Sequence, residues 1–175
     1  MDTNVSIKDL KVILESYKSW KILNINMSAF ASRSINFPEA ISESLCCYKL
    51  GYIWHNKANI KTTGDATGPQ NKLVEIKATS VFTSDLTSFS PDTHFDILIF
   101  ARLKLSEDKL YIYNMNMNYS QFQNIQINRK ETVFDQQKQG KRPRLSLIKL
   151  INEKCIKPID ILDLKELAAK LNITL

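Results

Sequence analysis

One stretch of the 175-residue sequence decides how the rest is interpreted: Gly64-Asp65-Ala66-Thr67-Gly68-Pro69-Gln70-Asn71-Lys72-Leu73-Val74-Glu75-Ile76-Lys77. In it an acidic residue precedes a turn, and an apolar strand then carries a glutamate and a lysine. Side chains two residues apart on a strand point to the same side of a sheet. We therefore expect Glu75 and Lys77 to project together, while Ile76 points into the core.

Turn-forming residues separate the upstream acid from this strand, because Gly68-Pro69-Gln70-Asn71 favours a chain reversal. A hairpin or bent strand pair would bring Asp65 beside Glu75. Two converging carboxylates, completed by the Ile76 carbonyl and water, offer the hard oxygen ligands that Mg²⁺ prefers. Phosphodiester hydrolysis needs such a metal and a cation or base beside the attacking water, and Lys77 is the natural candidate. The alternative is a solvated ion pair on an exposed strand.

Helices are expected before this stretch, and strands follow it. Apolar residues at helical spacing predict a helix from Ile7 to Ile25 and a second one from about Pro38 to Leu50, where Gly51 can cap it. Residues rich in Ile, Val, Phe and Tyr predict strands at Leu73–Thr79, Phe95–Leu103 and Leu110–Met117. Helical spacing returns from Pro158 onward and predicts a closing helix. The expected fold class is α/β, with a central mixed sheet flanked by helices, in one domain spanning residues 1–175.

The composition favours an anionic partner. There are 24 Lys and Arg residues against 18 Asp and Glu, a net charge of +6 that suits nucleic acid. No apolar run approaches the length of a membrane span and the start lacks a signal-peptide layout, so a cytoplasmic protein is expected. The cysteines and histidines lack metal-ligand spacing; we expect core thiols, and histidines with structural or phosphate-contacting roles. These residues are Cys46, Cys47, Cys155, His55 and His94.

A basic segment from Asp135 to Arg144 has no apolar period, which predicts an exposed loop or strand edge. Arg142 and Arg144, stiffened by the proline between them, could grip guanine, and Lys141 adds a further cation. Gln139 could read adenine or merely solvate the loop. The alternative is a flexible basic loop that touches phosphates without reading sequence.

Two further pairs of polar residues are candidates for the site. The hydroxyls of Thr87 and Ser88 suit phosphate contacts near the scissile bond, and a plain surface turn is the competing interpretation. Glu39 and Glu43 are four residues apart and share one helix face. Either glutamate could instead be ordinary surface charge, and Glu39 could be a partner of the helix dipole.

The arrangement of Asp65 with Glu75-Ile76-Lys77 resembles the PD-(D/E)-x-K nuclease signature, although Gly64 stands where that superfamily usually has proline. The whole chain resembles small type II restriction endonucleases of this superfamily. Three further stretches carry the resemblance across most of the chain: Ser34–Glu43, Asp85–Pro91 and Gln139–Ser146.

This resemblance implies a restriction-endonuclease-like core that hydrolyses double-stranded DNA with Mg²⁺. It implies that a glutamate from the helix before the sheet joins the metal site, with Glu43 as first choice and Glu39 as second. It also implies site-specific cleavage by a homodimer, at a short GC-rich palindrome such as GCNGC. A companion methyltransferase would modify the same site without forming a stable complex.

Two other functions remain open from the sequence. A repair or recombination nuclease on the same scaffold would recognise DNA structure rather than sequence. A non-catalytic DNA-binding module on a nuclease fold is the second alternative. Converging carboxylates count against such a module, because they repel phosphate unless a metal ion lies between them.

Overall fold

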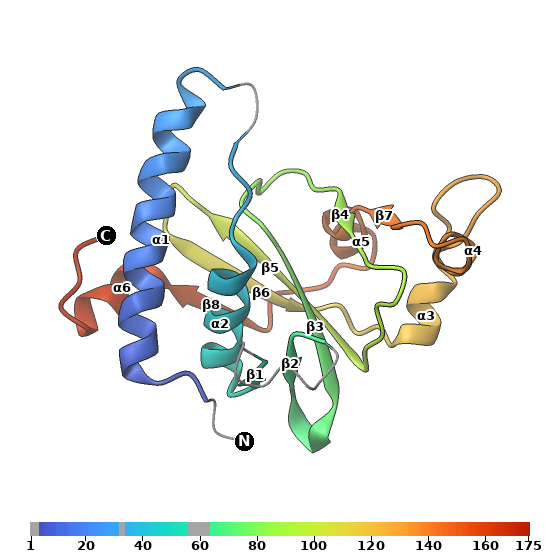
Figure 1. The fold of residues 1–175 in the computed structure, drawn as a ribbon, viewed down its shortest axis with the longest axis horizontal. Coiled ribbons are helices and arrows are strands. Elements are labelled where there is room, and N and C mark those ends of the chain that lie inside the picture. Colours follow the sequence, from blue (N-terminus) through green and yellow to red (C-terminus); the bar gives the residue numbers. More distant parts are fainter. Residues whose placement is uncertain (1–3, 32–33, 56–63) are drawn as a thin grey trace.

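The computed structural model describes residues 4–31, 34–55 and 64–175, which form a sheet with helices packed against it (Figure 1). Within these residues, the main sheet has the strand order β1-β2-β3-β5-β6-β8. The central pair β3 and β5 is parallel, whereas the other neighbours are antiparallel, so the predicted α/β class with a mixed sheet is confirmed. The strands are β1 Ile53–Trp54, β2 Ala66–Thr67, β3 Leu73–Thr79, β5 Ile97–Lys104, β6 Lys109–Asn114 and β8 Asp160–Asp163.

The two predicted N-terminal helices are present. Helix α1 spans Ile7–Ser28 and starts at a capping box in which Ser6 and Asp9 satisfy each other's backbone N–H groups. Helix α2 spans Glu39–Leu50 and ends at Gly51, whose φ of 69° is the left-handed conformation that glycine adopts most readily. The first helix thus extends slightly beyond its predicted end, and the second ends where expected.

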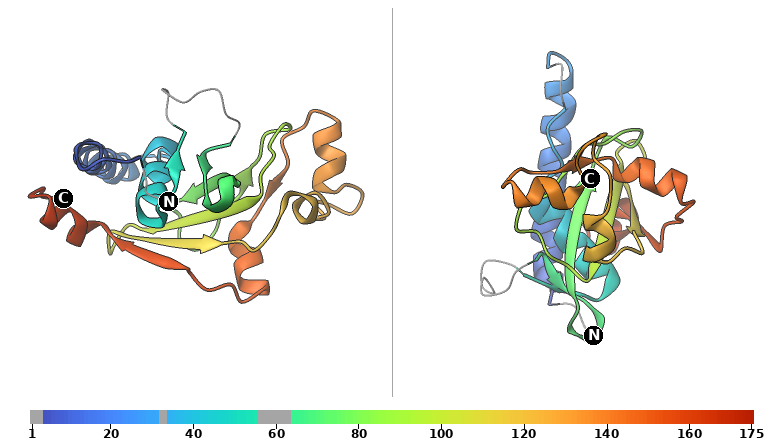
Figure 2. Two further views of the ribbon diagram at one scale, coloured as in Figure 1. Left: turned by 90° about the horizontal axis from the view of Figure 1, so that it is seen from below. Right: turned by 90° about the vertical axis from the view of Figure 1, so that its right-hand side faces the viewer.

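The sheet is buried on both faces by two apolar clusters. One face, which includes Ile76 and Ile99, packs against α1, α2 and α6, and the other, which includes Leu98 and Phe100, packs against α5 and the loops around it. Figure 2 shows α1 and α2 on one side of the sheet and α5 on the other. The prediction of an inward-pointing Ile76 is confirmed, and β5 is a central strand whose two faces are both covered.

A smaller unit lies at the end of the sheet away from α1, and its buried residues belong to the second apolar cluster. Its two strands, β4 and β7, pair antiparallel, and three short helices surround them. The prediction of a loop or strand edge for residues 135–144 is wrong in part, because Thr132 and Asp135 form a capping box that starts a helix there. The elements are β4 Thr87–Ser88, α3 Tyr119–Gln123, α4 Val133–Lys138, β7 Arg144–Leu145 and α5 Leu147–Glu153.

The C-terminal segment also differs from the prediction. The closing helix, α6 Leu164–Lys170, is present, but the residues before it form strand β8 rather than its first turns. Strand β8 pairs with β6, and Asp163 then caps α6 by accepting a hydrogen bond from the Glu166 N–H at 3.0 Å. Hydrogen bonding to a distant strand therefore overrides the helical spacing of residues such as Ile161.

The cysteines and the helices bear on two further predictions. Cys46 and Cys47 are buried as expected, but Cys155 is exposed, so the prediction of core thiols is wrong for that residue. Among the residues that the structure describes, no helix combines the length and apolar character needed to cross a membrane.

A buried carboxylate fixes α1 to the sheet. Asp108, in the turn between β5 and β6, is 1% exposed and accepts hydrogen bonds from the Tyr17 hydroxyl at 2.5 Å and the Lys21 ammonium at 2.7 Å. Lys165 of α6 lies 3.4 Å from the same carboxylate. Burial alone would raise the pKa of Asp108, but the bonds from Lys21 and Tyr17 outweigh it and hold the pKa below its usual value.

We predict that Asp108→Asn lowers the free energy of unfolding by about 2 to 3 kcal/mol at pH 7, because it leaves Lys21 without its buried partner. Asparagine tolerates the positive φ of 55° at this position, so the change isolates the charge. Since the folded pKa is lowered, the difference should be full above pH 4 and shrink as the carboxylate is protonated below it. Urea denaturation at several pH values measures it. Glu107→Gln, in a surface ion pair, should change stability by less than about 0.5 kcal/mol, and equal losses would contradict the assignment.

Candidate active site

A hairpin places Asp65 against the central part of β3. Strands β2 and β3 pair through Ala66 and Val74, and a 3₁₀ turn at Pro69–Asn71 joins them, as the turn residues predicted. The backbone N–H of Asp65 donates to the Val74 carbonyl at 2.9 Å. The Asp65 carboxylate then accepts a hydrogen bond from the Ile76 N–H at 2.7 Å. The hairpin therefore fixes both the backbone and the side chain of this acid.

The backbone conformation of Gly64 explains why this chain lacks the proline that the PD-(D/E)-x-K signature has before its first acid. Its φ is 81°, and a Cβ at this position would lie 2.7 Å from a methyl group of Leu73. Proline is restricted to a φ near −65° and cannot adopt this conformation. The chain enters the hairpin by a left-handed turn that requires glycine.

Glu75 and Lys77 lie side by side on β3, as the strand period predicted. Their side chains form an ion pair of 2.6 Å and are only 9% and 20% exposed, respectively. The Lys77 ammonium also lies 5.7 Å from the centre of the Phe89 ring. An exposed, solvated pair, the alternative interpretation, does not describe this geometry.

The two glutamates of α2 occupy different positions. Glu43 is partly buried and accepts a hydrogen bond from the Trp54 indole N–H at 3.1 Å. Burial, reinforced by the negative charge of Asp65, raises the pKa of Glu43 to about 7. Glu39 is exposed at the start of the helix and lines the pocket described below. Its charge is nevertheless close enough to raise the pKa of both Asp65 and Glu75.

The negative charge of the carboxylates on the hairpin exceeds the positive charge near them. Burial raises the pKa of Asp65 and of Glu75, and the proximity of Asp65 raises that of Glu75 further. Lys77 opposes both shifts, and its own pKa is raised because the two carboxylates outweigh the effect of burial. One ammonium group cannot neutralise two buried carboxylates and the nearby Glu43. This excess of negative charge is what a bound divalent cation would relieve.

The donor set fits a magnesium ion with a partly hydrated shell. No group of three or more His, Cys, Asp or Glu side chains within the described residues is arranged as a metal cluster. Asp65 and Glu75 supply two carboxylates, which suits Mg²⁺ because this ion commonly keeps several water ligands. The N–H and C=O of one strand residue point to the same neighbouring strand, so the Ile76 carbonyl faces the Asp65 side.

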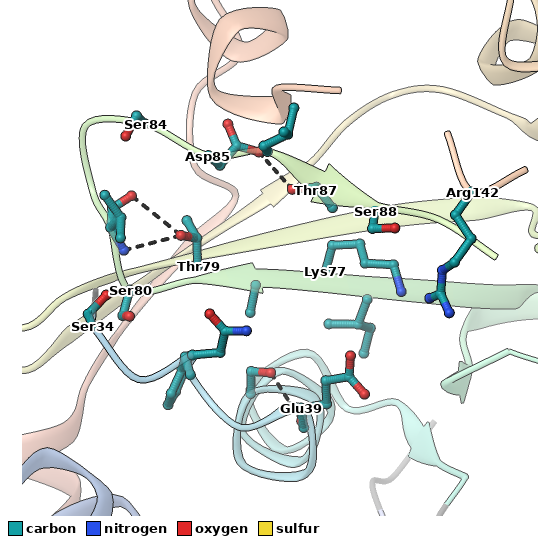
Figure 3. Close-up of a pocket in the computed structure, with 17 residues that line it drawn as sticks. Ser34, Glu39, Lys77, Thr79, Ser80, Ser84, Asp85, Thr87, Ser88 and Arg142 are labelled. Carbon is teal, nitrogen blue, oxygen red and sulfur yellow. Dashed lines mark hydrogen bonds between the residues drawn. The ribbon is translucent and has the colours of Figure 1, made fainter. Parts of the chain in front are cut away.

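A pocket of about 580 Å³ opens beside this pair, between β3, the start of α2 and β4. Figure 3 shows Lys77 of β3, Glu39 of α2 and Arg142 of the loop before β7 directed into it. Asp65 and Glu75 do not line the pocket but adjoin it through Ile76 and Lys77. The predicted site residues that line it are Glu39, Ile76, Lys77, Thr87, Ser88 and Arg142.

The remaining predicted DNA-contacting residues lie outside this pocket. Gln139 and Lys141 both donate hydrogen bonds to the Glu131 carboxylate, at 3.2 and 3.0 Å. Arg144 is exposed on β7, where it is paired with Ser88. Arg142 and Arg144 therefore remain exposed, whereas Gln139 and Lys141 have partners within the protein.

The role of Asp85 was not predicted from the sequence. Its carboxylate accepts hydrogen bonds from the Thr87 hydroxyl at 2.7 Å, the Ser146 hydroxyl at 2.6 Å and the N–H groups of Leu147 and Ile148 at the start of α5. The Thr87 proton is thus engaged, so Thr87 can accept but not donate a hydrogen bond, whereas Ser88 stays a candidate donor. The only signal in the sequence was the polar residue Ser146 before an apolar run.

His55 braces the base of the hairpin. Its Nδ1 lies 3.1 Å from the Gly64 carbonyl oxygen and its Nε2 lies 2.7 Å from the Thr67 hydroxyl. The histidine therefore contacts residues on both sides of Asp65. This arrangement agrees with the structural role expected for His55.

Comparison with known proteins now identifies the family. The family model described as Bsp6I restriction endonuclease matches residues 5–154. The chain belongs to this family. The type II restriction enzyme Bsp6I of Bacillus sp. (strain RFL6) is 45% identical over 141 residues, which cover 80% of this chain and 79% of that enzyme. No solved structure matches the chain.

The match to the Bsp6I family confirms the resemblance to small type II restriction endonucleases. Its matched range contains every site residue discussed above, from Glu39 to Arg144. Strand β8 and helix α6 lie beyond it. Membership of this family indicates that the protein is a nuclease.

We predict that Glu43→Gln stabilises the metal-free protein at high pH. A raised pKa in the folded state means that stability falls as pH rises from the unfolded value of 4.5 to about 7. The variant should therefore be more stable by about 2 to 3 kcal/mol at pH 8.5, and by less than about 1 kcal/mol at pH 5. Urea denaturation with EDTA at both pH values provides the measurement. A variant less stable than the wild type at pH 8.5 would show that Glu43 is not under electrostatic strain.

Proposed function

We propose that this protein is a type II restriction endonuclease that hydrolyses phosphodiester bonds in double-stranded DNA at defined sites, with Mg²⁺, on a PD-(D/E)-x-K core. The observation that carries this proposal is the adjacency of Asp65, Glu75 and Lys77 at the edge of a buried sheet, beside a pocket that Arg142 enters. Membership of the Bsp6I family supports the same activity.

Asp65, Glu75 and the Ile76 carbonyl are the groups that would hold Mg²⁺, with Glu43 as a further acid on the α2 side. When bound, the ion would neutralise charge that builds on the phosphoryl oxygens and lower the pKa of a water ligand. The raised pKa values of the three acids support this assignment, since each carboxylate is destabilised without a cation.

Lys77 has the properties of a positioning cation. Its pKa is raised, so the ammonium stays protonated at neutral pH and donates hydrogen bonds rather than accepting a proton. From β3 it points into the pocket where a phosphate would lie. We infer that it orients the attacking water and stabilises negative charge on the phosphate.

The proposed DNA contacts use polar and basic side chains in the pocket and beside it. We assign a phosphate contact to Ser88, the role of a hydrogen-bond acceptor to Thr87, and guanine contacts to Arg142 and Arg144. Two arginines suit a short GC-rich palindrome. A palindrome is matched by a two-fold symmetric homodimer in which each active site cuts one strand, and a companion methyltransferase would protect host DNA.

The decisive test is cleavage of unmethylated phage DNA followed by sequencing of the fragment ends. We predict discrete Mg²⁺-dependent fragments for the wild type and a loss of at least about 100-fold in cleavage rate for Lys77→Ala, because a cation at the reacting phosphate is lost. The matched control is Lys72→Ala, an exposed lysine at the end of the hairpin turn, which should cleave normally.

The other outcomes separate the competing functions. Cleavage confined to branched DNA would favour a repair or recombination nuclease. Absence of cleavage with folded wild-type protein and DNA from several sources would favour the binding module. An equal loss of cleavage rate in Lys72→Ala and Lys77→Ala would contradict the assignment of Lys77 to the active site.

A second prediction concerns metal binding without DNA. Mg²⁺ at about ten times its dissociation constant should stabilise the wild type by about 1.4 kcal/mol, which for a chain of this size raises Tm by about 3 to 6 °C. Asp65→Asn should remove most of this shift, and Asp92→Asn, at an exposed site, should retain it. Differential scanning calorimetry in EDTA and in Mg²⁺ measures both. A full shift in Asp65→Asn would place the ion elsewhere.

A further inference from the structure

Exposed arginines gather in one short segment of the described chain. Arg102 is buried in the sheet, whereas Arg129, Arg142 and Arg144 are all exposed. Residues 126–144 carry six Lys and Arg against two acids, a net charge of +4 out of +6 for the whole protein. Arginine's planar, multiply donating group is the side chain that suits phosphate recognition.

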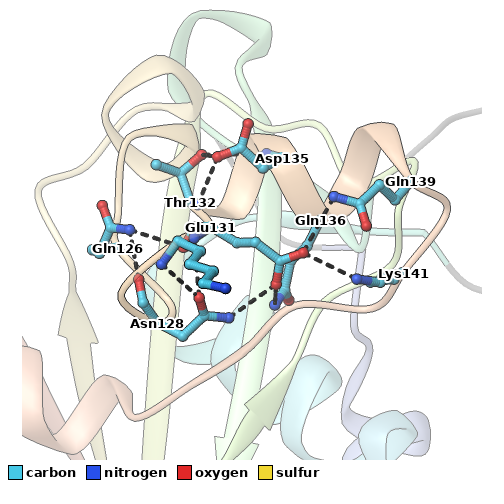
Figure 4. A network of polar contacts seen from close by, with 9 residues as sticks. Gln126, Asn128, Glu131, Thr132, Asp135, Gln136, Gln139 and Lys141 are labelled. Atoms are coloured by element: carbon cyan, nitrogen blue, oxygen red, sulfur yellow. Dashed lines mark hydrogen bonds and ion pairs between the residues drawn. The ribbon is translucent and has the colours of Figure 1, made fainter.

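Both acids of this segment are engaged in its own structure. Asp135 belongs to the capping box of α4. The Glu131 carboxylate accepts hydrogen bonds from Asn128 at 2.9 Å, Gln136 at 3.0 Å, Gln139 at 3.2 Å and Lys141 at 3.0 Å. These bonds hold the pKa of Glu131 at about 2. Figure 4 shows Glu131 at the centre of the network.

The network closes a tight loop. Gln126 and Thr132 form an antiparallel bridge, and the N–H of Ile127 donates to the Glu131 carbonyl at 3.0 Å. The side-chain oxygen of Asn128 accepts hydrogen bonds from the N–H groups of residues 130 and 131, at 2.9 and 3.0 Å. The tip of this loop is therefore Arg129-Lys130.

The side chains of the two tip residues do not stabilise the described part of the chain. Both are exposed, and no hydrogen bond or ion pair of their side chains is formed with another described residue. The loop below them is held at several points, and the ion pair of Glu131 with Lys141 fixes it to the residue that precedes Arg142. The side chains of Arg129 and Lys130 thus have no partner among the described residues, and the loop that holds them is linked through Lys141 to the segment that enters the pocket.

We propose that the loop of residues 126–131 is a second DNA contact, in which Arg129 and Lys130 bind backbone phosphates flanking the recognition sequence and Glu131 positions them. This inference rests on the proposed endonuclease function. Phosphates rather than base edges fit the tip, because both side chains are exposed and neither is packed in the fixed orientation that two-pronged base recognition needs.

The test is equilibrium binding in Ca²⁺, which prevents turnover, to duplexes with the same recognition sequence and flanks of increasing length. The double variant Arg129→Ala/Lys130→Ala should bind long duplexes about 10- to 100-fold more weakly and gain nothing from added flanks. The slope of log affinity against log salt concentration should become shallower by about two in this variant, since each phosphate contact contributes about 0.9 to the slope. Sequence preference should be retained. The control Lys8→Ala/Lys11→Ala removes two exposed charges from α1, at the opposite end of the molecule, and should bind as the wild type does.

Glu131→Gln separates positioning from simple charge. It raises the net charge from +6 to +7, so electrostatics alone would strengthen binding to DNA. Positioning predicts the reverse, because the amide cannot hold all four donors and the loop loses its fixed link to Lys141. We expect the flank-dependent affinity to fall about 5- to 20-fold, with the affinity for the shortest duplex retained.

The outcomes distinguish this inference from the proposed function. Wild-type cleavage combined with unchanged binding by the Arg129 and Lys130 variant would overturn the second contact and leave the endonuclease intact. Tighter binding by Glu131→Gln would overturn its positioning role. A changed recognition sequence in the double variant would replace phosphate contact by base recognition.

Discussion

The hydrogen bond from the Ile76 N–H to the Asp65 carboxylate is the interaction on which the site depends. It lies where the pairing of β2 with β3 ends at Val74, so a side chain takes the place of the next strand residue. The carboxylate thereby stays at the sheet edge, and the rest of β3 is left open on that side. The pocket lies along this open part of β3, from Ile76 to Thr79.

Rigid support for the edge comes from the strand behind it. Strand β5 is buried on both faces and pairs with β3 along its length, from Val74 to Thr79. The charged residues Glu75 and Lys77 are in register with Leu98 and Phe100, whose side chains belong to the second apolar cluster. Charges held against such a surface are poorly hydrated, which is the physical origin of the raised carboxylate pKa values.

Local patterns were sufficient to predict the hairpin of β2 and β3 and failed for the smaller unit that contains β4 and β7. Strand β3 has its predicted bounds and Gly51 ends α2, because a period of two and a glycine cap are local signals. Strands β7 and β8 pair with partners more than thirty residues away in sequence, and no local period reports such pairing. The roles of Asp85 and Glu131 were likewise not predicted, since Asp85 accepts a hydrogen bond from Ser146, 61 residues away, and Glu131 pairs with Lys141 on the far side of α4. The proposed metal and DNA contacts of the site residues are still predictions.

Strand β8 has a consequence for the solubility of the fold. Strand β6 is rich in apolar and aromatic residues, and without β8 its backbone groups would form a long free edge able to pair with another chain. Strand β8 covers that edge and is itself a poor template for further pairing, because Pro158 precedes it and Asp160 and Asp163 lie at its ends. Strand β8 therefore protects the fold against edge-to-edge aggregation, although it lies outside the range matched by the family model.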